Sequence, residues 1–159
     1  MTTPSPNNIK TVAFIGAGNM GAPMAWRAHQ AGFELIVCDR NENALATFQE
    51  KGIRVTREST DCAAADVIIV LLANDTQVLD VLTGPNGICH HIPAGHQPVV
   101  CMMGTTLPDT LNTLKGPLEA SGAHLVDAPI SGGIVGAQNG TLSIMMGGHE
   151  SQVQRLMPL

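Results

Sequence analysis

Three glycines near the N-terminus have a spacing that could hold a diphosphate group. Gly16, Gly18 and Gly21 follow the apolar run KTVAFI and precede a stretch of helical periodicity, which gives G-x-G-x-x-G between a strand and a helix. The first glycine would allow a tight turn, the second a close approach of phosphate to the backbone, and the third close packing of the helix on the strand. The unpaired N–H groups at the start of that helix favour an anion.

An acidic residue stands where a dinucleotide site would need it. Asp39 ends the second predicted strand, at about the 20-residue offset from which a carboxylate can accept a hydrogen bond from the adenosine ribose. This carboxylate favours NAD because it would repel the 2′-phosphate of NADP, whereas the neighbouring Arg40 could pair with that phosphate. The sequence therefore predicts dinucleotide binding, with NAD as the expected cofactor and NADP still open. Methyltransferases carry a similar glycine turn, so a nucleoside cofactor such as S-adenosylmethionine is a rival.

A second segment could bind a carboxylate. The residues DAPISGGIVGAQNGTLSIMMGG, positions 127 to 148, directly follow a predicted strand and include a hydroxyl at Ser131 before Gly132 and Gly133. Consecutive small residues leave their backbone N–H groups bare, and such a nest can hold an anionic group. A glycine-rich linker to a last strand is the alternative, and the residue pattern alone leaves both open.

An alternation of strand and helix patterns must position these groups. Strands are expected at 10–15, 33–38, 54–56, 67–72, 98–102, 124–126 and 142–146, and helices at 20–31, 42–51, 59–65, 77–82, 108–121 and from Ser151 onward. The aliphatic run VIIVLL needs cover on both faces and should be central. The pattern predicts one α/β domain over residues 1–159, a doubly wound (Rossmann) mostly parallel sheet with helices on both faces. Ligands of such sheets bind at the carboxyl ends of the strands.

Composition excludes several other classes of protein. The formal net charge of −5 and only 8 lysines and arginines leave no basic surface for nucleic acid. No apolar run approaches the roughly 20 residues that cross a bilayer, and the start, MTTPSPNN, lacks the layout of a signal peptide, so we expect no membrane partner and a cytoplasmic location. The four cysteines form no C-x-x-C pair, and the adjacent His90 and His91 have no ligand partners at metal-binding spacing, so we expect no metal site.

Two motifs together resemble a known family. FIGAGNMGAPMA and DAPISGGIVGAQNGTLSIMMGG are similar to the N-terminal and substrate-loop signatures of the β-hydroxyacid dehydrogenases, which include 3-hydroxyisobutyrate dehydrogenase, tartronate semialdehyde reductase and, more distantly, 6-phosphogluconate dehydrogenase. The resemblance covers nearly the whole chain. It implies an oxidoreductase that transfers a hydride between NAD(P) and a small β-hydroxy acid, and a full-length enzyme that is a homo-oligomer.

The resemblance also assigns roles to individual residues. It places the substrate's acid and hydroxyl groups at Ser131, Gly132 and Gly133, and the cofactor at Gly16, Gly18, Asn19, Met20, Gly21, Asp39, Arg40, Leu72, Ala73, Asn74 and Thr105. The chain departs from the family pattern at Ala73, where proline is common. Gly104 and Met102 replace a serine and an aspartate near Thr105, which weakens the role of that threonine.

The catalytic group that the resemblance implies is not found in this sequence. In the family, a helical C-terminal domain supplies a lysine within a G-x-x-x-K-x-x-N type motif, and Lys10, Lys51 and Lys115 do not stand in such a motif. We therefore expect no catalytic residue in this chain, and the general acid/base lysine and the helical domain beyond Leu159. A non-catalytic dinucleotide-sensing module is the alternative, although a sensor would not need a carboxylate nest.

Overall fold

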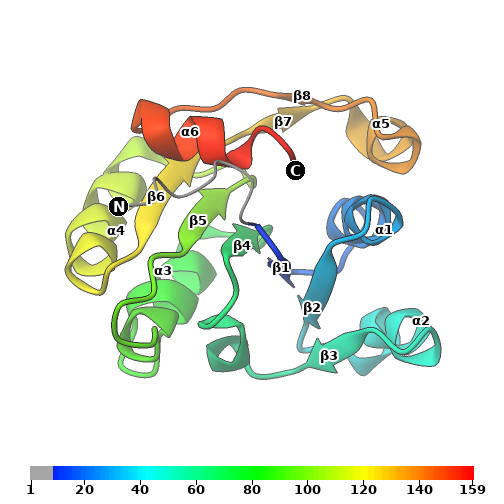
Figure 1. Ribbon diagram of the computed structural model, residues 1–159, viewed down its shortest axis with the longest axis horizontal. Helices are drawn as coiled ribbons and strands as arrows, with labels where there is room; N and C mark the ends of the chain where they lie inside the picture. The colour runs from blue at the N-terminus through cyan, green and yellow to red at the C-terminus, as the bar shows by residue number, and fades with distance from the viewer. Residues whose placement is uncertain (1–8) are drawn as a thin grey trace, which may run out of the picture.

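A six-stranded parallel sheet forms the centre of the molecule. The computed structural model describes residues 9–159; the segment MTTPSPNN, in which we expect no signal peptide, lies outside the described residues. The strands are β1 (Thr11–Ile15), β2 (Glu34–Cys38), β3 (Arg54–Thr56), β4 (Val67–Val70), β5 (Val99–Met102) and β6 (His124–Asp127). Their order across the sheet is β3-β2-β1-β4-β5-β6, which confirms the predicted doubly wound α/β fold (Figure 1).

Helices cover both faces of this sheet, as Figure 1 shows. One face is covered by α1 (Gly21–Gln30), α2 (Glu42–Glu50) and α6 (Glu150–Leu156). The other is covered by α3 (Asp75–Thr83), α4 (Pro108–Ala120) and two short 3-10 helices, η1 (Ser59–Cys62) and η2 (Ile88–His90). Alternate strand residues enter opposite cores: Val12 and Phe14 pack under α1, and Ala13 and Ile15 pack toward α3 and η1. This two-sided burial explains why the strands are continuous apolar runs.

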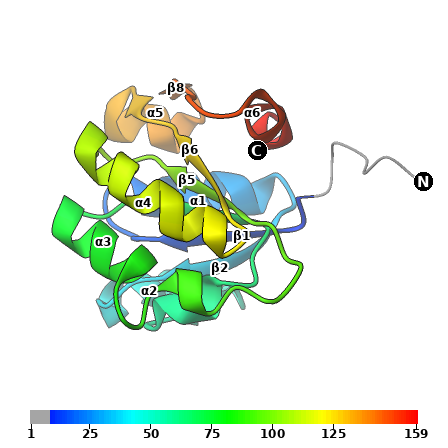
Figure 2. The same cartoon turned by 90° about the vertical axis from the view of Figure 1, so that its left-hand side faces the viewer.

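The glycine-rich segment after β6 differs from the expectation. A strand was expected over residues 142–146, but only β8 (Ser143–Ile144) forms, and it pairs antiparallel with β7 (Ile130–Ser131) outside the main sheet. Between these strands lies α5 (Gly133–Asn139), which contacts α1. The helix ends at Gly140, whose left-handed φ of 67° reverses the chain so that β8 runs back along β7. Figure 2 shows α5 and α6 on the same side of the strands.

Helix length also bears on membrane insertion. Within residues 9–159, none of the helices combines the length and the apolar character that a membrane crossing requires.

Candidate functional site

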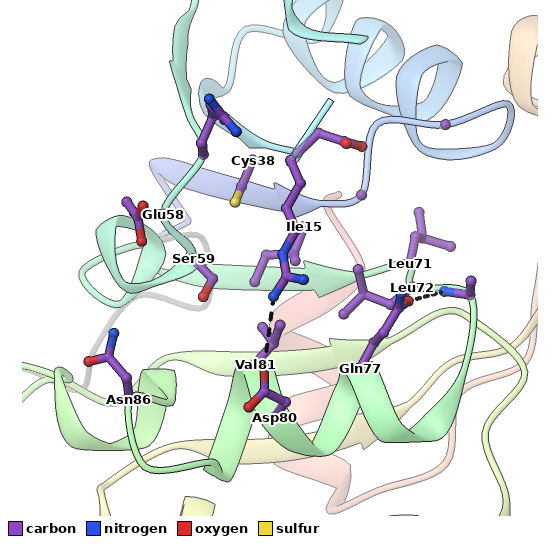
Figure 3. Close-up of a pocket in the computed structure, with 16 residues that line it drawn as sticks. Ile15, Cys38, Glu58, Ser59, Leu71, Leu72, Gln77, Asp80, Val81 and Asn86 are labelled. Carbon is purple, nitrogen blue, oxygen red and sulfur yellow. Dashed lines mark hydrogen bonds and ion pairs between the residues drawn. The ribbon is translucent and has the colours of Figure 1, made fainter. Parts of the chain in front are cut away.

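A groove of about 800 Å³ opens at the carboxyl edge of the sheet (Figure 3). It lies where the chain, after running outward from β1 to β3, crosses back to place β4 on the other side of β1, which is the topological switch point of the sheet. Residues that follow β1, β2, β3 and β4 line it. Six of the residues predicted to bind a cofactor are among them: Gly16, Gly18, Asp39, Arg40, Leu72 and Ala73.

The three glycines of the first turn have distinct structural surroundings. Gly16 has a φ of 102°, and a methyl group on it would overlap the carbonyl oxygen of Leu71. A methyl group on Gly21 would overlap the carbonyl oxygen of Gly16. A methyl group on Gly18 would meet nothing within 4 Å, because Gly18 faces the open groove. No side chain caps the N-terminus of α1. The N–H of Ala22 donates to the carbonyl oxygen of Gly18 at 3.0 Å and Pro23 has no N–H, so any donors for an anionic ligand must come from the residues that precede Ala22.

Asp39 joins the end of β2 to the glycine turn. Its Oδ2 accepts a hydrogen bond from the backbone N–H of Ala17 at 2.8 Å, and its Oδ1 accepts one from Asn41 at 2.8 Å. The N–H of Gly16 also donates to the carbonyl oxygen of Cys38 at 2.9 Å. The sequence indicated only a ribose contact for Asp39, and this role in holding the turn was missed. Each carboxylate oxygen has a second lone pair for a ligand hydroxyl.

The rim of the groove is rich in paired charges. Arg40 Nη2 lies 3.8 Å from Asp80 Oδ2, an ion pair that joins the end of β2 to α3 and is drawn as the dashed line at Asp80 in Figure 3. Arg57, which follows β3, donates to Glu42 Oε1 at 2.8 Å. Sequence reasoning missed Arg57 and Asp80. Arg57 was open to prediction, since it directly follows a strand and so stands at the ligand-binding edge.

The turn after β4 contributes backbone and small side chains. Leu72 and Ala73 line the groove, and the N–H of Ala73 donates to Gln77 Oε1 at 3.2 Å. Asn74 does not line the groove. Its side-chain oxygen accepts from the N–H of Gln77 at 2.9 Å and caps α3, so asparagine is explained at this position by helix capping.

The remaining predicted residues lie outside this groove. Asn19 is exposed and Met20 half-buried on the glycine turn, and Thr105 is exposed after β5. Ser131 ends β7, and Gly132 and Gly133, with φ values of 134° and 64°, lead into α5. The structure therefore brings together the expected adenosine and diphosphate residues, while the expected substrate residues form a separate exposed segment at the start of α5.

One polar contact supports the turn that carries Thr105. Asp75 Oδ2 accepts from the N–H of Leu107 at 3.1 Å and from the hydroxyl of Thr110 at 2.6 Å, which joins the N-termini of α3 and α4. Thr110 is buried. No sequence pattern indicated this pair, because Asp75 and Thr110 belong to different helices.

The cysteines are separate thiols. Cys38 borders the groove, where a hydrogen bond from the thiol of Cys62 lowers the pKa of Cys38, while the same bond and burial raise the pKa of Cys62. Burial raises the pKa of Cys101 to about 12. Across the part of the chain that the structure describes, no three His, Cys, Asp or Glu side chains lie together as metal ligands would.

The strand order, the glycine turn and the groove at the switch point define a Rossmann-type nucleotide-binding domain. Residues 11–159 match the family described as the NAD binding domain of 6-phosphogluconate dehydrogenase. The chain belongs to this family, as an NAD(P)-binding domain of the β-hydroxyacid dehydrogenase type, and the resemblance inferred from its motifs is confirmed.

The chain is similar over most of its length to several longer proteins. The NAD-dependent L-serine dehydrogenase of Pseudomonas aeruginosa is 34% identical over 152 residues, which is 95% of this chain and 50% of the relative. The structure of Mycobacterium tuberculosis 3-hydroxyisobutyrate dehydrogenase with L-serine superposes with a TM-score of 0.85 at 30% identity, over 94% of this chain and 50% of the other. The structure of Psf3 in complex with NADP⁺ and 2-OPP superposes with a TM-score of 0.84 at 26% identity, over 92% of this chain and 52% of Psf3. The chain thus spans about half the length of these proteins.

Proposed function

We propose that this chain binds NAD(H) in the groove at the switch point, for an enzyme that transfers a hydride between the nicotinamide and the hydroxyl-bearing carbon of a small β-hydroxy acid. The observation that carries the proposal is the glycine turn, where Gly18 leaves open space above the uncapped start of α1. The diphosphate would lie there and the adenosine ribose beside Asp39. The bound cofactor supplies the hydride chemistry, and the protein supplies position.

The charges of the rim favour NAD over NADP. Three carboxylates, those of Asp39, Glu58 and Asp80, line the groove with two arginines, Arg40 and Arg57. Both arginines already have acidic partners. A 2′-phosphate would therefore enter a net negative rim, whereas the ribose hydroxyls of NAD meet a hydrogen-bond acceptor.

The substrate would be a small acid of the kind that the relatives' names indicate, such as 3-hydroxyisobutyrate or L-serine. We place its carboxylate at Ser131, Gly132 and Gly133, where two consecutive glycines leave the backbone N–H groups without side-chain cover. The proton of the substrate hydroxyl needs a base. Lys10 and Lys51 precede β1 and β3 at the amino edge of the sheet, and Lys115 is exposed on α4, on the other face of the sheet from α5. We therefore propose that this base lies outside residues 1–159.

The test is cofactor binding by calorimetry, with NADH, NADPH and S-adenosylmethionine as titrants. The parent chain should bind NADH, and Gly18→Val should lose at least tenfold in affinity because its side chain fills the space assigned to the diphosphate. Gly116→Val is the matched control, since Gly116 lies exposed on α4 with nothing within 4 Å and away from the groove. Equal NADH affinity in Gly18→Val and the parent, or binding of S-adenosylmethionine alone, would contradict the proposal.

A further inference from the structure

The Arg40–Asp80 ion pair connects two elements across the rim of the groove. Arg40 follows β2 and Asp80 lies on α3, which follows β4, and both line the groove. Their separation is 3.8 Å, and their side chains are 81% and 64% exposed. An ion pair this exposed contributes little to folding. Because both side chains line the groove, the pair can be changed at little cost to the fold and lies where a ligand would meet it.

We propose that Asp80 is a cofactor-selecting residue that disfavours NADP by holding Arg40 away from the 2′-phosphate. This inference rests on the proposed binding of a dinucleotide in the groove. The guanidinium that follows the second strand is the group best placed to pair with a 2′-phosphate. The carboxylate of Asp80 competes with that phosphate for the guanidinium, so its presence acts against NADP through Arg40.

Asp39 is less suited to this role than its position suggests. Both of its oxygens accept backbone N–H groups, from Ala17 and Asn41, and these donors offset part of its negative charge. Within residues 9–159, by contrast, the structure pairs the Asp80 carboxylate with Arg40 alone. Arg57 is paired with Glu42 at 2.8 Å, so Arg40, at 3.8 Å from Asp80, is the arginine that its partner holds less closely.

The experiment measures the ratio of the dissociation constants for NADPH and NADH on the 159-residue chain. Asp80→Asn should lower this ratio by about three- to tenfold, because a charge-assisted contact to phosphate replaces a solvent-exposed ion pair. The double variant Asp80→Asn/Arg40→Gln should return the ratio to the parent value, since the gain acts through Arg40. Asp80→Glu keeps the carboxylate and should keep the high ratio.

Glu119→Gln is the matched control for the loss of one negative charge. Glu119 is exposed near the end of α4, at the opposite edge of the sheet from the groove. The ratio of the NADPH and NADH dissociation constants in Glu119→Gln should therefore equal that of the parent. An unchanged ratio in Asp80→Asn, a gain that survives Arg40→Gln, or an equal gain in Glu119→Gln would overturn the role of Asp80. A parent that binds neither dinucleotide would instead overturn the proposed function, and this inference with it.

Discussion

Alanine substitutions at Gly21 and Gly18 should separate folding from cofactor binding. In Gly21→Ala the new methyl group meets the carbonyl group of Gly16, and because this is backbone it has no rotamer by which to move away. Helix α1 must then shift on β1, and such overpacking costs about 1–3 kcal/mol. At about 2–4 °C per kcal/mol for a chain of this size, the melting temperature should fall by roughly 2–12 °C.

Gly18→Ala has no such clash, because nothing lies within 4 Å of the added methyl group. Its free energy of unfolding should stay within about 0.5 kcal/mol of the parent, while its affinity for NADH falls. Thermal unfolding followed by circular dichroism measures the first effect and calorimetry the second. Gly116→Ala, on the exposed side of α4, should be neutral or stabilising by up to about 1 kcal/mol. Equal destabilisation by Gly18→Ala and Gly21→Ala would refute the division of roles.

Two further predictions concern residues outside the groove. Asp75→Ala leaves the buried Thr110 hydroxyl and the Leu107 N–H without their acceptor, so the free energy of unfolding measured in urea should fall by about 1–3 kcal/mol. An unchanged midpoint of unfolding would mean that the contact is not maintained in solution. Cys101, whose pKa burial raises to about 12, should stay protonated and unmodified by a thiol reagent at pH 8 until the chain unfolds. Peptide mass spectrometry checks this, and labelling of Cys101 as fast as that of the half-buried Cys89 would contradict it.

The alternation of strands and helices was open to prediction because it depends on local patterns that all agree. The apolar run at β4 is buried on both faces, and glycines at the ends of β1 and α1 fix where those elements stop. The helix α5 was missed because a glycine-rich segment has low intrinsic helix propensity. Its Gly136 and Ala137 are buried, so tertiary packing stabilises a helix that the local sequence disfavours.

The candidate site divides in the same way. Gly16, Gly18 and Gly21 were predictable because their spacing is a recognised pattern in which each glycine has its own reason: a positive φ at Gly16, no room for a side chain at Gly21, and open space for a ligand at Gly18. The partners Asp80 and Asp75 were not, because each acts on a residue of another element and only the fold brings them together. Asp39 is intermediate between these cases. Its position at the end of a strand could be predicted from the sequence, but its hydrogen bond with the N–H of Ala17 could be seen only in the folded turn.

The glycine turn and the rim of the groove therefore respond differently to substitution. The turn is held by backbone contacts at Gly16 and Gly21, where any side chain must displace a helix or a strand, so change there costs stability. The rim is set by exposed ion pairs such as Arg40–Asp80, each worth at most about 1 kcal/mol to folding. A rim charge can thus be exchanged while the fold is retained. A tenfold change in affinity for NADP requires a change of only about 1.4 kcal/mol in binding free energy. We therefore expect single substitutions at the rim to change the preference between the two dinucleotides without loss of the fold.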